Sequence, residues 1–335
     1  MTLRTCLLGI AAAVGVLAAP ACAAPEAASA QTASSDAVRP VVVPGAREIP
    51  FVSSVTGTPM RLLVWQPSRP APPQGYPLLL AFDGDDTFAL LVDTYRSIGG
   101  ASLRAGAAPL AIAAIAYGEG AGGERDRIRD MTPAIVASDM PDRPNGKPWP
   151  ETGGGDRFLE MVEREVKPLL ASALPLDPGR QTLFGHSLGG LMVLHRLSTK
   201  PDAFDCYAAS SASLWAGGGR MVTVLADFLD KSAPMDPRPR LILSVGDAEE
   251  DLGPWDAGVP GMDIEARRRW IKGNAMVSRA RDLAAIVREK GSAKLDFVFR
   301  EYPGRSHQPA KIIASLDAVG EAVSCGAPSR PAPSR

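Results

Sequence analysis

Apolar runs of strand length alternate with stretches of helical periodicity along most of the chain. The strand-like runs are rich in aliphatic and aromatic residues, and they lie at 61–66, 76–82, 109–116, 181–184, 206–210, 240–245 and 294–300. Between them, apolar residues recur at helical spacing at 88–98, 157–174, 188–198, 222–229, 264–290 and 310–323. This alternation indicates a mainly parallel sheet with helices on both faces. We therefore predict one α/β domain that extends over residues 39–325.

The two ends of the chain differ in composition from this domain. Residues 1–23 combine Arg4, an apolar run too short to span a bilayer, and the cleavage site Ala21-Cys22-Ala23, which together are typical of a secretory signal peptide. Lipid anchoring at Cys22 is the minor alternative, because Ala19 stands where lipoprotein signals usually have leucine. Residues 24–38, rich in Ala, Ser and Gln, and residues 326–335, rich in Pro, Ser and Arg, are predicted to be disordered. We expect the mature protein to be periplasmic or secreted.

Charge and cysteine content limit the possible partners and the possible disulfides. The formal net charge of the 335 residues is −1, which favours neither nucleic acid nor an anionic membrane as a partner. No second apolar run is long enough to span a bilayer, so the mature chain is expected to have no integral membrane segment. Cys206 and Cys325 remain after removal of residues 1–23, and in an oxidising compartment they could pair. The sequence leaves both the disulfide and two free thiols open.

A nucleophile motif lies where a strand meets a helix. Gly185-His186-Ser187-Leu188-Gly189 follows the strand at 181–184 and opens the helix at 188–198, which is the context of the G-x-S-x-G nucleophile elbow. Glycines on both sides of the serine let neighbouring backbone approach the turn closely. The amide of Leu188, at the start of the helix, would then face a developing oxyanion. We predict Ser187 as a nucleophile, against the alternative of an ordinary glycine-rich turn.

Only three histidines could serve as its general base. We expect His186, beside the serine, to point away from the site, and His195, in the following helix, to be a packed or surface residue. His307 follows the last strand and a short turn, which is where an α/β-hydrolase carries its catalytic histidine. His307 is therefore the predicted base.

A carboxylate should orient that histidine. The strand at 240–245 runs into Asp247-Ala248-Glu249-Glu250-Asp251, and a run this acidic must reach solvent or a site. A buried carboxylate would fix the tautomer of the histidine and stabilise the imidazolium formed during proton transfer. Glu249, three residues after the strand-ending Gly246, is the preferred candidate, while Asp247, Glu250 and Asp251 remain alternatives.

The second oxyanion donor should follow the strand at 76–82. That strand ends in Asp83-Gly84-Asp85-Asp86, where the glycine permits a turn that would direct an amide at Ser187. The amide of Asp85 is the predicted donor. The alternative is a plain solvated turn.

Several motifs, in order and spacing, resemble a known family over about residues 61–323. They are Tyr76-Pro77 with Asp83-Gly84, Arg129-Asp130-Met131-Thr132-Pro133, Gly153-Gly154-Gly155-Asp156-Arg157-Phe158-Leu159, Gly185 to Gly190, Ser211-Ala212-Ser213-Leu214-Trp215, and Tyr302-Pro303-Gly304 before His307. Together they resemble the esterase D-like esterases, and within these the periplasmic siderophore esterases that act on enterobactin and salmochelin. The resemblance implies an α/β-hydrolase fold and serine hydrolysis of carboxylic esters, with ferric or iron-free catecholate trilactones as substrates. It also implies that a serine and histidine pair can work with a weak or displaced acid.

The same resemblance supplies substrate-binding candidates. Arg129 would bind acidic substrate groups, and its alternative is a local ion pair with Asp126 or Asp130. Trp215 is expected to contact the substrate, and Trp255 is expected either to stack on an aromatic group or to close its loop over the core. The segments 118–155 and 251–270 are the expected pocket walls. Two departures from the family pattern fall near the pocket: Ala216 replaces a second tryptophan, and Asp85-Asp86 replaces the more usual Asn-Ala.

These observations lead to one functional hypothesis and three rivals. We expect an exported serine carboxylic-ester hydrolase that acts on a small-molecule ester, in the manner of a siderophore esterase, without metal or organic cofactor. The alternatives on the same scaffold are a feruloyl-type esterase, an acyltransferase and a non-catalytic binding protein.

Overall fold

The computed structural model describes residues 42–254, 256 and 263–326. The predicted signal peptide 1–23, the predicted linker 24–38, residues 327–335 of the predicted tail and Trp255 lie outside the described residues. The described chain from Val43 onward forms one compact unit.

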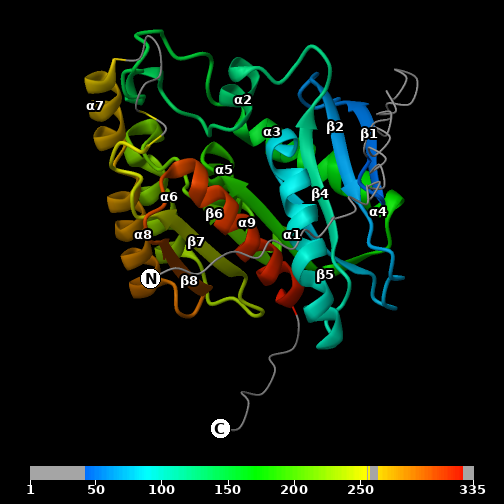
Figure 1. Cartoon of the computed structure of the whole chain (residues 1–335). Coiled ribbons are helices and arrows are strands. Elements are labelled where there is room, and N and C mark those ends of the chain that lie inside the picture. The colour runs from blue at the N-terminus through cyan, green and yellow to red at the C-terminus, as the bar shows by residue number, and fades with distance from the viewer. Residues whose placement is uncertain (1–41, 255, 257–262, 327–335) are drawn as a thin grey trace, which may run out of the picture. The chain divides into compact units, whose positions relative to one another are not determined.

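An eight-stranded sheet runs through this unit (Figure 1). Its strands stand in the order β1-β2-β4-β3-β5-β6-β7-β8. Their bounds are Ala46–Val52 for β1, Pro59–Trp65 for β2, Tyr76–Ala81 for β3, Ala111–Tyr117 for β4, Leu176–His186 for β5, Cys206–Ser210 for β6, Arg240–Gly246 for β7 and Asp296–Tyr302 for β8. Strand β2 is antiparallel to β1 and β4, and β3 to β8 are parallel. The prediction of a mainly parallel sheet is confirmed.

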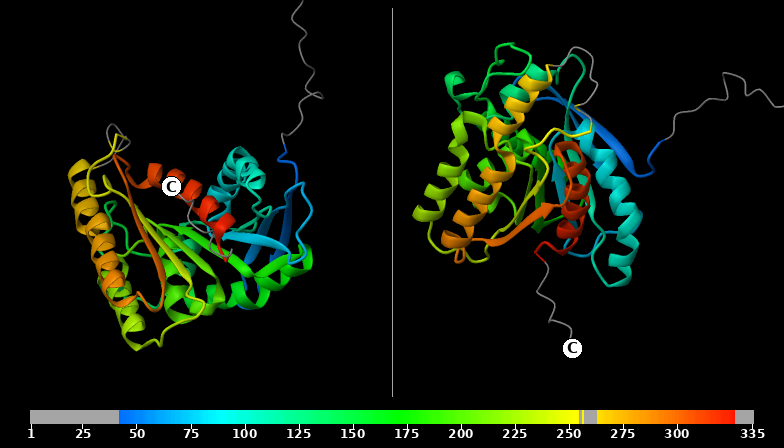
Figure 2. Two further views of the ribbon diagram at one scale, coloured as in Figure 1. Left: turned by 90° about the horizontal axis from the view of Figure 1, so that it is seen from below. Right: turned by 60° about the vertical axis from the view of Figure 1, so that its left-hand side comes forward.

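Helices cover both faces of the sheet. The α-helices of the described residues are α1 (Gly84–Arg104), α2 (Glu124–Asp130), α3 (Gly155–Met161), α4 (Lys167–Ala173), α5 (Leu188–Thr199), α6 (Arg220–Lys231), α7 (Ile264–Asn274), α8 (Met276–Lys290) and α9 (His307–Ser324). Helices α1 (cyan) and α9 (red) lie together on one face, and α5, α6 and α8 pack on the other (Figure 2). The apolar run of β3 is explained by its burial on both faces of the sheet. Leu78 and Leu80 enter one core and Leu79 and Ala81 enter the other.

Several boundaries differ from the predicted ones. Strand β1 was not predicted, because only every second or third of its side chains is partly buried and Pro50 interrupts its pattern. The helix predicted at 264–290 is two helices, since Ala275 between them has a left-handed backbone with φ of 47°. His307 was predicted on a loop but is the first residue of α9.

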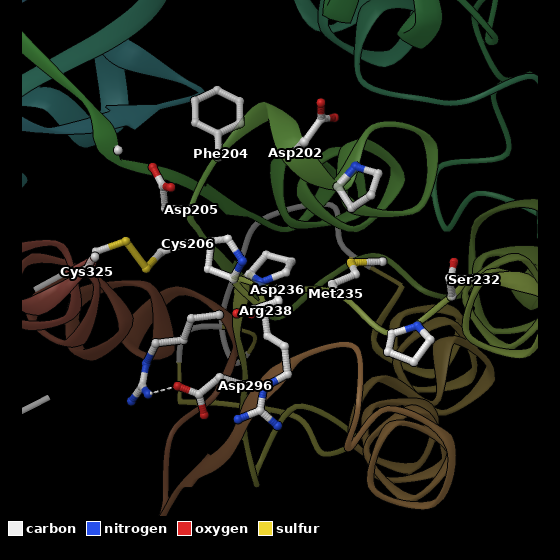
Figure 3. Close-up of a pocket in the computed structure, with 18 of the residues that line it drawn as sticks. Asp202, Phe204, Asp205, Cys206, Ser232, Met235, Asp236, Arg238, Asp296 and Cys325 are labelled. Carbon is white, nitrogen blue, oxygen red and sulfur yellow. Dashed lines mark hydrogen bonds and ion pairs between the residues drawn. A yellow bond between two sulfur atoms is a disulfide. The ribbon is translucent and has the colours of Figure 1, made fainter. Parts of the chain in front are cut away.

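Cys206 and Cys325 form a disulfide, with Cα atoms 6.1 Å apart, which settles the alternative that the sequence left open. Cys206 begins β6 and Cys325 directly follows α9. Figure 3 shows the bridge in the wall of a pocket of about 1150 Å³, which Phe204, Met235 and Arg238 also line. This pocket lies at the amino ends of the parallel strands, because Cys206 and Arg240 are the first residues of β6 and β7.

None of the helices within the described ranges has the length and apolarity needed to cross a bilayer.

Candidate active site

The predicted catalytic residues lie at one edge of the sheet, where the parallel strands end. Ser187 directly follows β5, Glu249 comes three residues after β7, and His307 comes five residues after β8. Because these strands run in the same direction, their carboxyl ends meet at the edge where α/β proteins usually bind ligands. The site therefore lies at the opposite end of the strands from the disulfide.

The backbone at Ser187 has the strained conformation of a nucleophile elbow. Its φ of 61° and ψ of −119° lie in a region that residues other than glycine rarely adopt. Three hydrogen bonds hold it there: its N–H donates to the carbonyl of Ser210 at 3.0 Å, and its own carbonyl accepts from the amides of Leu191 and Ser213, each at 3.0 Å. Gly185 is required because a Cβ there would clash with the carbonyl of Gly189. The sequence thus folds into a turn that presents the serine at the start of α5.

Glu249 and His307 form the expected carboxylate–imidazole pair. Nδ1 of His307 lies 2.6 Å from Oε2 of Glu249, whose side chain is fully buried. The other oxygen, Oε1, accepts from the amide of Gly246 at 2.7 Å and from the hydroxyl of Ser211 at 2.5 Å. A buried carboxylate is stable only when its lone pairs are occupied in this way. The hydrogen bond at Nδ1 leaves Nε2 of His307 as the nitrogen that can take up a proton.

The other acids of the same loop are held elsewhere. The carboxylate of Asp247 accepts from the amide of Gly304, and that of Glu250 accepts from the amide and hydroxyl of Ser278. Asp251 is exposed. Of the four carboxylates, the structure therefore brings Glu249 to the histidine.

His186 lies against the candidate base, and the expectation that it points away from the site is wrong. Its ring centroid is 4.5 Å from that of His307, and its Nδ1 lies 3.1 Å from the hydroxyl of Ser210. Burial lowers the pKa of His186 well below its ordinary value, and the nearby charges of His307, Lys311 and Arg127 lower it further. A neutral imidazole therefore packs against the base. Because His186 precedes Ser187 directly, the ring contact also brings His307 beside the elbow.

Two serines after β6 were not recognised as site residues from the sequence. The hydroxyl of Ser213 lies 3.2 Å from that of Ser187, and Ser211 donates to Glu249. Ser211 has a left-handed backbone with φ of 43°, and its amide donates to the carbonyl of Ser244 at 2.7 Å. The signal that could have revealed them is their place directly after a buried strand, at the same edge as the elbow.

The two predicted oxyanion donors lie in the first turns of helices. Leu188 is the first residue of α5, and Asp85 is the second residue of α1. The first amides of an α-helix have no partner within the helix, so they are available to a ligand. In α1, the amides of Asp86 and Thr87 instead donate to the carbonyl of Asp83, each at 3.0 Å. The side chain of Asp85 pairs with Arg61 at 2.5 Å and is 60% exposed.

Neighbouring carboxylates hold the guanidinium of Arg129. Its Nε and Nη2 donate to the two carboxylate oxygens of Asp130 at 2.7 and 3.0 Å, and its Nη1 donates to Asp126 at 3.1 Å. The hydrogen bond to Asp130 raises the pKa of Arg129 above its ordinary value in spite of partial burial. The bidentate face that a substrate acid would need is occupied by Asp130, and substrate binding by Arg129 stays a prediction. The local ion pair is what the structure shows.

Aromatic side chains gather near the elbow. Trp215 is 9% exposed and lies 5.7 Å from Trp149 and 5.3 Å from Trp270, as measured between ring centroids. We call these three residues the tryptophan cluster. It contains residues from both predicted pocket walls, and Arg143 stacks over Trp149 at 5.1 Å. Trp215 comes two residues after Ser213, whose hydroxyl contacts that of Ser187.

His195 is a packed helix residue, as expected, with its Nε2 2.6 Å from Asp156. Within the described residues, no group of three or more His, Cys, Asp or Glu side chains is arranged to hold a metal ion.

Comparison with known proteins identifies the family. The model of the family described as "Putative esterase" matches residues 53–284. The chain belongs to this esterase family. The apo-salmochelin esterase of Escherichia coli is 31% identical over 259 residues, which cover 76% of this chain and 72% of that protein. The ferri-bacillibactin esterase BesA of Bacillus subtilis is 34% identical over 189 residues, which cover 56% of this chain and 65% of that protein.

The match to BesA therefore spans less than two thirds of that relative's length. Among solved structures, the BES protein from Bacillus cereus superimposes with a TM-score of 0.69 at 28% identity, over 84% of this chain and 97% of that one. The predicted α/β-hydrolase fold and the predicted family are confirmed.

Proposed function

We propose that the chain is a serine hydrolase that cleaves carboxylic esters, and that its natural substrate is a siderophore ester. The observation that carries the proposal is the hydrogen bond of 2.6 Å between the buried Glu249 and His307, beside a serine held in the strained elbow conformation. A nucleophile, a base and an orienting acid at one edge of the sheet are what acyl transfer requires.

The proposed reaction proceeds through an acyl-enzyme. The hydroxyl of Ser187 gives its proton to Nε2 of His307 while its oxygen attacks the ester carbonyl, and Glu249 stabilises the imidazolium that forms. The amides of Leu188 and Asp85 hold the oxyanion of the tetrahedral intermediate. The imidazolium then returns the proton to the leaving alkoxide, and water activated by His307 releases the acid.

The proposed substrate class rests on the relatives and on the tryptophan cluster. The two curated relatives carry the names of esterases for bacillibactin and salmochelin, both siderophores. The aromatic rings of this cluster would offer stacking surface to an aryl acyl group such as a catechol.

Charge around the site favours an iron-free substrate. The segment 118–155 carries seven acidic and five basic residues. Arg127, Arg129 and Arg143 of this segment are each paired with a carboxylate of the protein. A ferric triscatecholate carries several negative charges, and this wall offers it little net attraction. We therefore expect the iron-free ester to be hydrolysed faster than its ferric complex.

Export is part of the same proposal. We propose that residues 1–23 are a signal peptide, because their pattern predicts cleavage and because the disulfide suits an oxidising compartment. The intact mass of the protein recovered from the periplasm or medium tests this. A mass that still includes residues 1–23 would contradict it.

The decisive experiment is a substrate panel on purified protein that lacks residues 1–23. Wild type and Ser187→Ala are compared on a short p-nitrophenyl ester, a feruloyl ester, and a catecholate trilactone with and without iron. We expect hydrolysis by wild type, loss of at least about 10³-fold in Ser187→Ala, and a higher kcat/KM for the trilactone than for the simple ester. Full activity in Ser187→Ala would exclude the serine mechanism. A wild type that hydrolyses none of these esters and does not react with a fluorophosphonate would support the binding-protein alternative.

A further inference from the structure

Asp83 stands at the turn that should carry the second oxyanion amide, in a conformation that needs support. It lies between β3 and α1 with φ of 54° and ψ of 54°, the left-handed region that aspartate and asparagine enter more often than other residues except glycine, still at a steric cost. Its carbonyl accepts the amides of Asp86 and Thr87 and the hydroxyl of Thr87. The direction of the next two amides, those of Gly84 and Asp85, therefore depends on this one residue.

The side chain of Asp83 does not cap its own helix, although aspartate is a preferred residue for that purpose. Both of its oxygens instead bind the guanidinium of Arg127: Oδ1 accepts from Nε at 2.6 Å and Oδ2 accepts from Nη2 at 2.9 Å. The carboxylate is 12% exposed and the guanidinium side chain 32% exposed. A bidentate pair of this kind fixes orientation as well as distance.

The same carboxylate also touches the elbow. A Cβ on Gly189 would lie 3.2 Å from Oδ2 of Asp83, so the second residue of α5 packs against the ion pair. Leu188, the proposed first oxyanion donor, is the neighbour of Gly189. The ion pair is thus in contact with both turns from which oxyanion amides are proposed to come.

Arg127 comes from segment 118–155, which the sequence predicts as one pocket wall. It lies on α2, which is tied to the start of α3 by hydrogen bonds from the amide of Gly154 to the carbonyl of Arg129 and from the amide of Gly155 to that of Thr132. Burial lowers the pKa of Arg127, but the hydrogen bonds and charge of Asp83 outweigh this and raise it above its ordinary value. The guanidinium is therefore cationic at neutral pH.

We infer that Arg127 is a positioning residue for ester hydrolysis, which holds the Asp83 turn so that the amide of Asp85 points at the oxyanion. The inference rests on the proposed function. Arg127 does not touch the reacting atoms. It acts through Asp83, and one ion pair links α2 to the turn that carries the proposed oxyanion amide.

The test compares Arg127→Met, Arg127→Lys and Asp83→Asn with a matched ion pair elsewhere. Arg240 is the control, because its guanidinium is 31% exposed, donates to Glu321 at 2.8 Å and to Asp296 at 2.5 Å, and lies at the opposite end of the strands. For Arg127→Met we expect kcat on a p-nitrophenyl ester to fall about 10- to 100-fold with KM within about threefold, because a misdirected donor weakens transition-state binding alone. Arg127→Lys should recover part of kcat, and Arg240→Met should leave kcat within about twofold.

A second measurement separates positioning from a merely structural role. A trifluoromethyl ketone forms an oxyanion adduct with the serine, so its affinity should fall by the same factor as kcat/KM in the Arg127 and Asp83 variants. Equal effects of Arg127→Met and Arg240→Met on kcat, or a change confined to KM, would overturn the inference. If Arg127→Met does not fold, Asp83→Asn, which keeps the side-chain volume, decides by the same criteria. If wild type hydrolyses the ester and the Arg127 and Asp83 variants have the same kcat, this inference alone is overturned. If wild type neither hydrolyses esters nor reacts with a fluorophosphonate, the proposed function is overturned as well.

Discussion

The hydroxyl of Ser211 connects the proposed catalytic acid to the sheet. It is one of two donors to Oε1 of Glu249, the other being the amide of Gly246. Ser211→Ala should lower kcat/KM about 10- to 100-fold, because a lost hydrogen bond to a buried carboxylate is worth about 1.5–3 kcal/mol. Steady-state kinetics on a p-nitrophenyl ester measure this. The control is Ser278→Ala, which removes a similar hydroxyl from the neighbouring Glu250. Equal effects of the two substitutions would show that Ser211 has no special role.

The buried imidazole of His186 predicts how stability depends on pH. Its pKa in the folded protein is well below the ordinary value of 6.5, so below pH 6.5 the unfolded chain takes up a proton that the folded chain does not. The free energy of unfolding is therefore highest above pH 6.5 as far as His186 is concerned. It decreases as the pH falls, by at most about 1.4 kcal/mol per pH unit. Urea denaturation at pH 7.5, 6.5 and 5.5 should show a shallower loss in His186→Asn than in wild type. Parallel curves for the two proteins would contradict the prediction.

Individual residues also show how much of the candidate site could be predicted from the sequence. The predicted nucleophile, base and acid lie at one edge of the sheet because each follows a strand that the pattern predicts. Arg127 was missed because its partner, Asp83, is 44 positions away in the chain. Its neighbour Arg129 was chosen from a motif. A motif identifies a residue type and its position, but pairing with Asp130 decides whether the guanidinium is free to bind a substrate.

At the scale of elements, periodicity predicted those strands and helices that bury a full face. Strand β6 and helix α5, both of them buried, are close to their predicted bounds. The break between α7 and α8 was not predictable, because it falls at Ala275, a good helix former, and the apolar spacing continues on both sides. Tertiary packing therefore overrides local propensity at this position.

The break at Ala275 predicts that glycine substitutions at two nearby positions change the free energy of unfolding in opposite directions. Ala275→Gly should stabilise the protein by about 1 kcal/mol, because glycine adopts the left-handed backbone with φ of 47° without the steric strain of a Cβ. The matched control is Ala285→Gly, at an exposed position inside α8, which should destabilise by about 1 kcal/mol. The free energy of unfolding in urea measures both. Destabilisation by Ala275→Gly would mean that the strain is not relieved there.

At the scale of the whole molecule, the two ends of the parallel strands have separate roles. The proposed chemistry lies at the carboxyl ends, where β5, β7 and β8 lead to Ser187, Glu249 and His307. The disulfide lies at the amino ends. The sequence shows Cys206 at the start of a strand-like run and Cys325 just after the last helical stretch. It could not decide the bond, because that depends on the distance between Cα atoms of residues separated by 119 positions.

This separation predicts that the disulfide supports stability and not catalysis. A crosslink across 119 positions removes much of the chain entropy of the unfolded state, so Cys206→Ala with Cys325→Ala should lower the free energy of unfolding by about 2–5 kcal/mol. The end of α9 has a second attachment, since Arg180 donates to the carbonyls of Cys325 at 2.9 Å and Val323 at 2.8 Å. The double variant should therefore fold and keep wild-type kcat/KM, and a reductant should destabilise wild type but not the variant. A loss of kcat/KM in the folded double variant would show instead that the two ends of the sheet are energetically coupled.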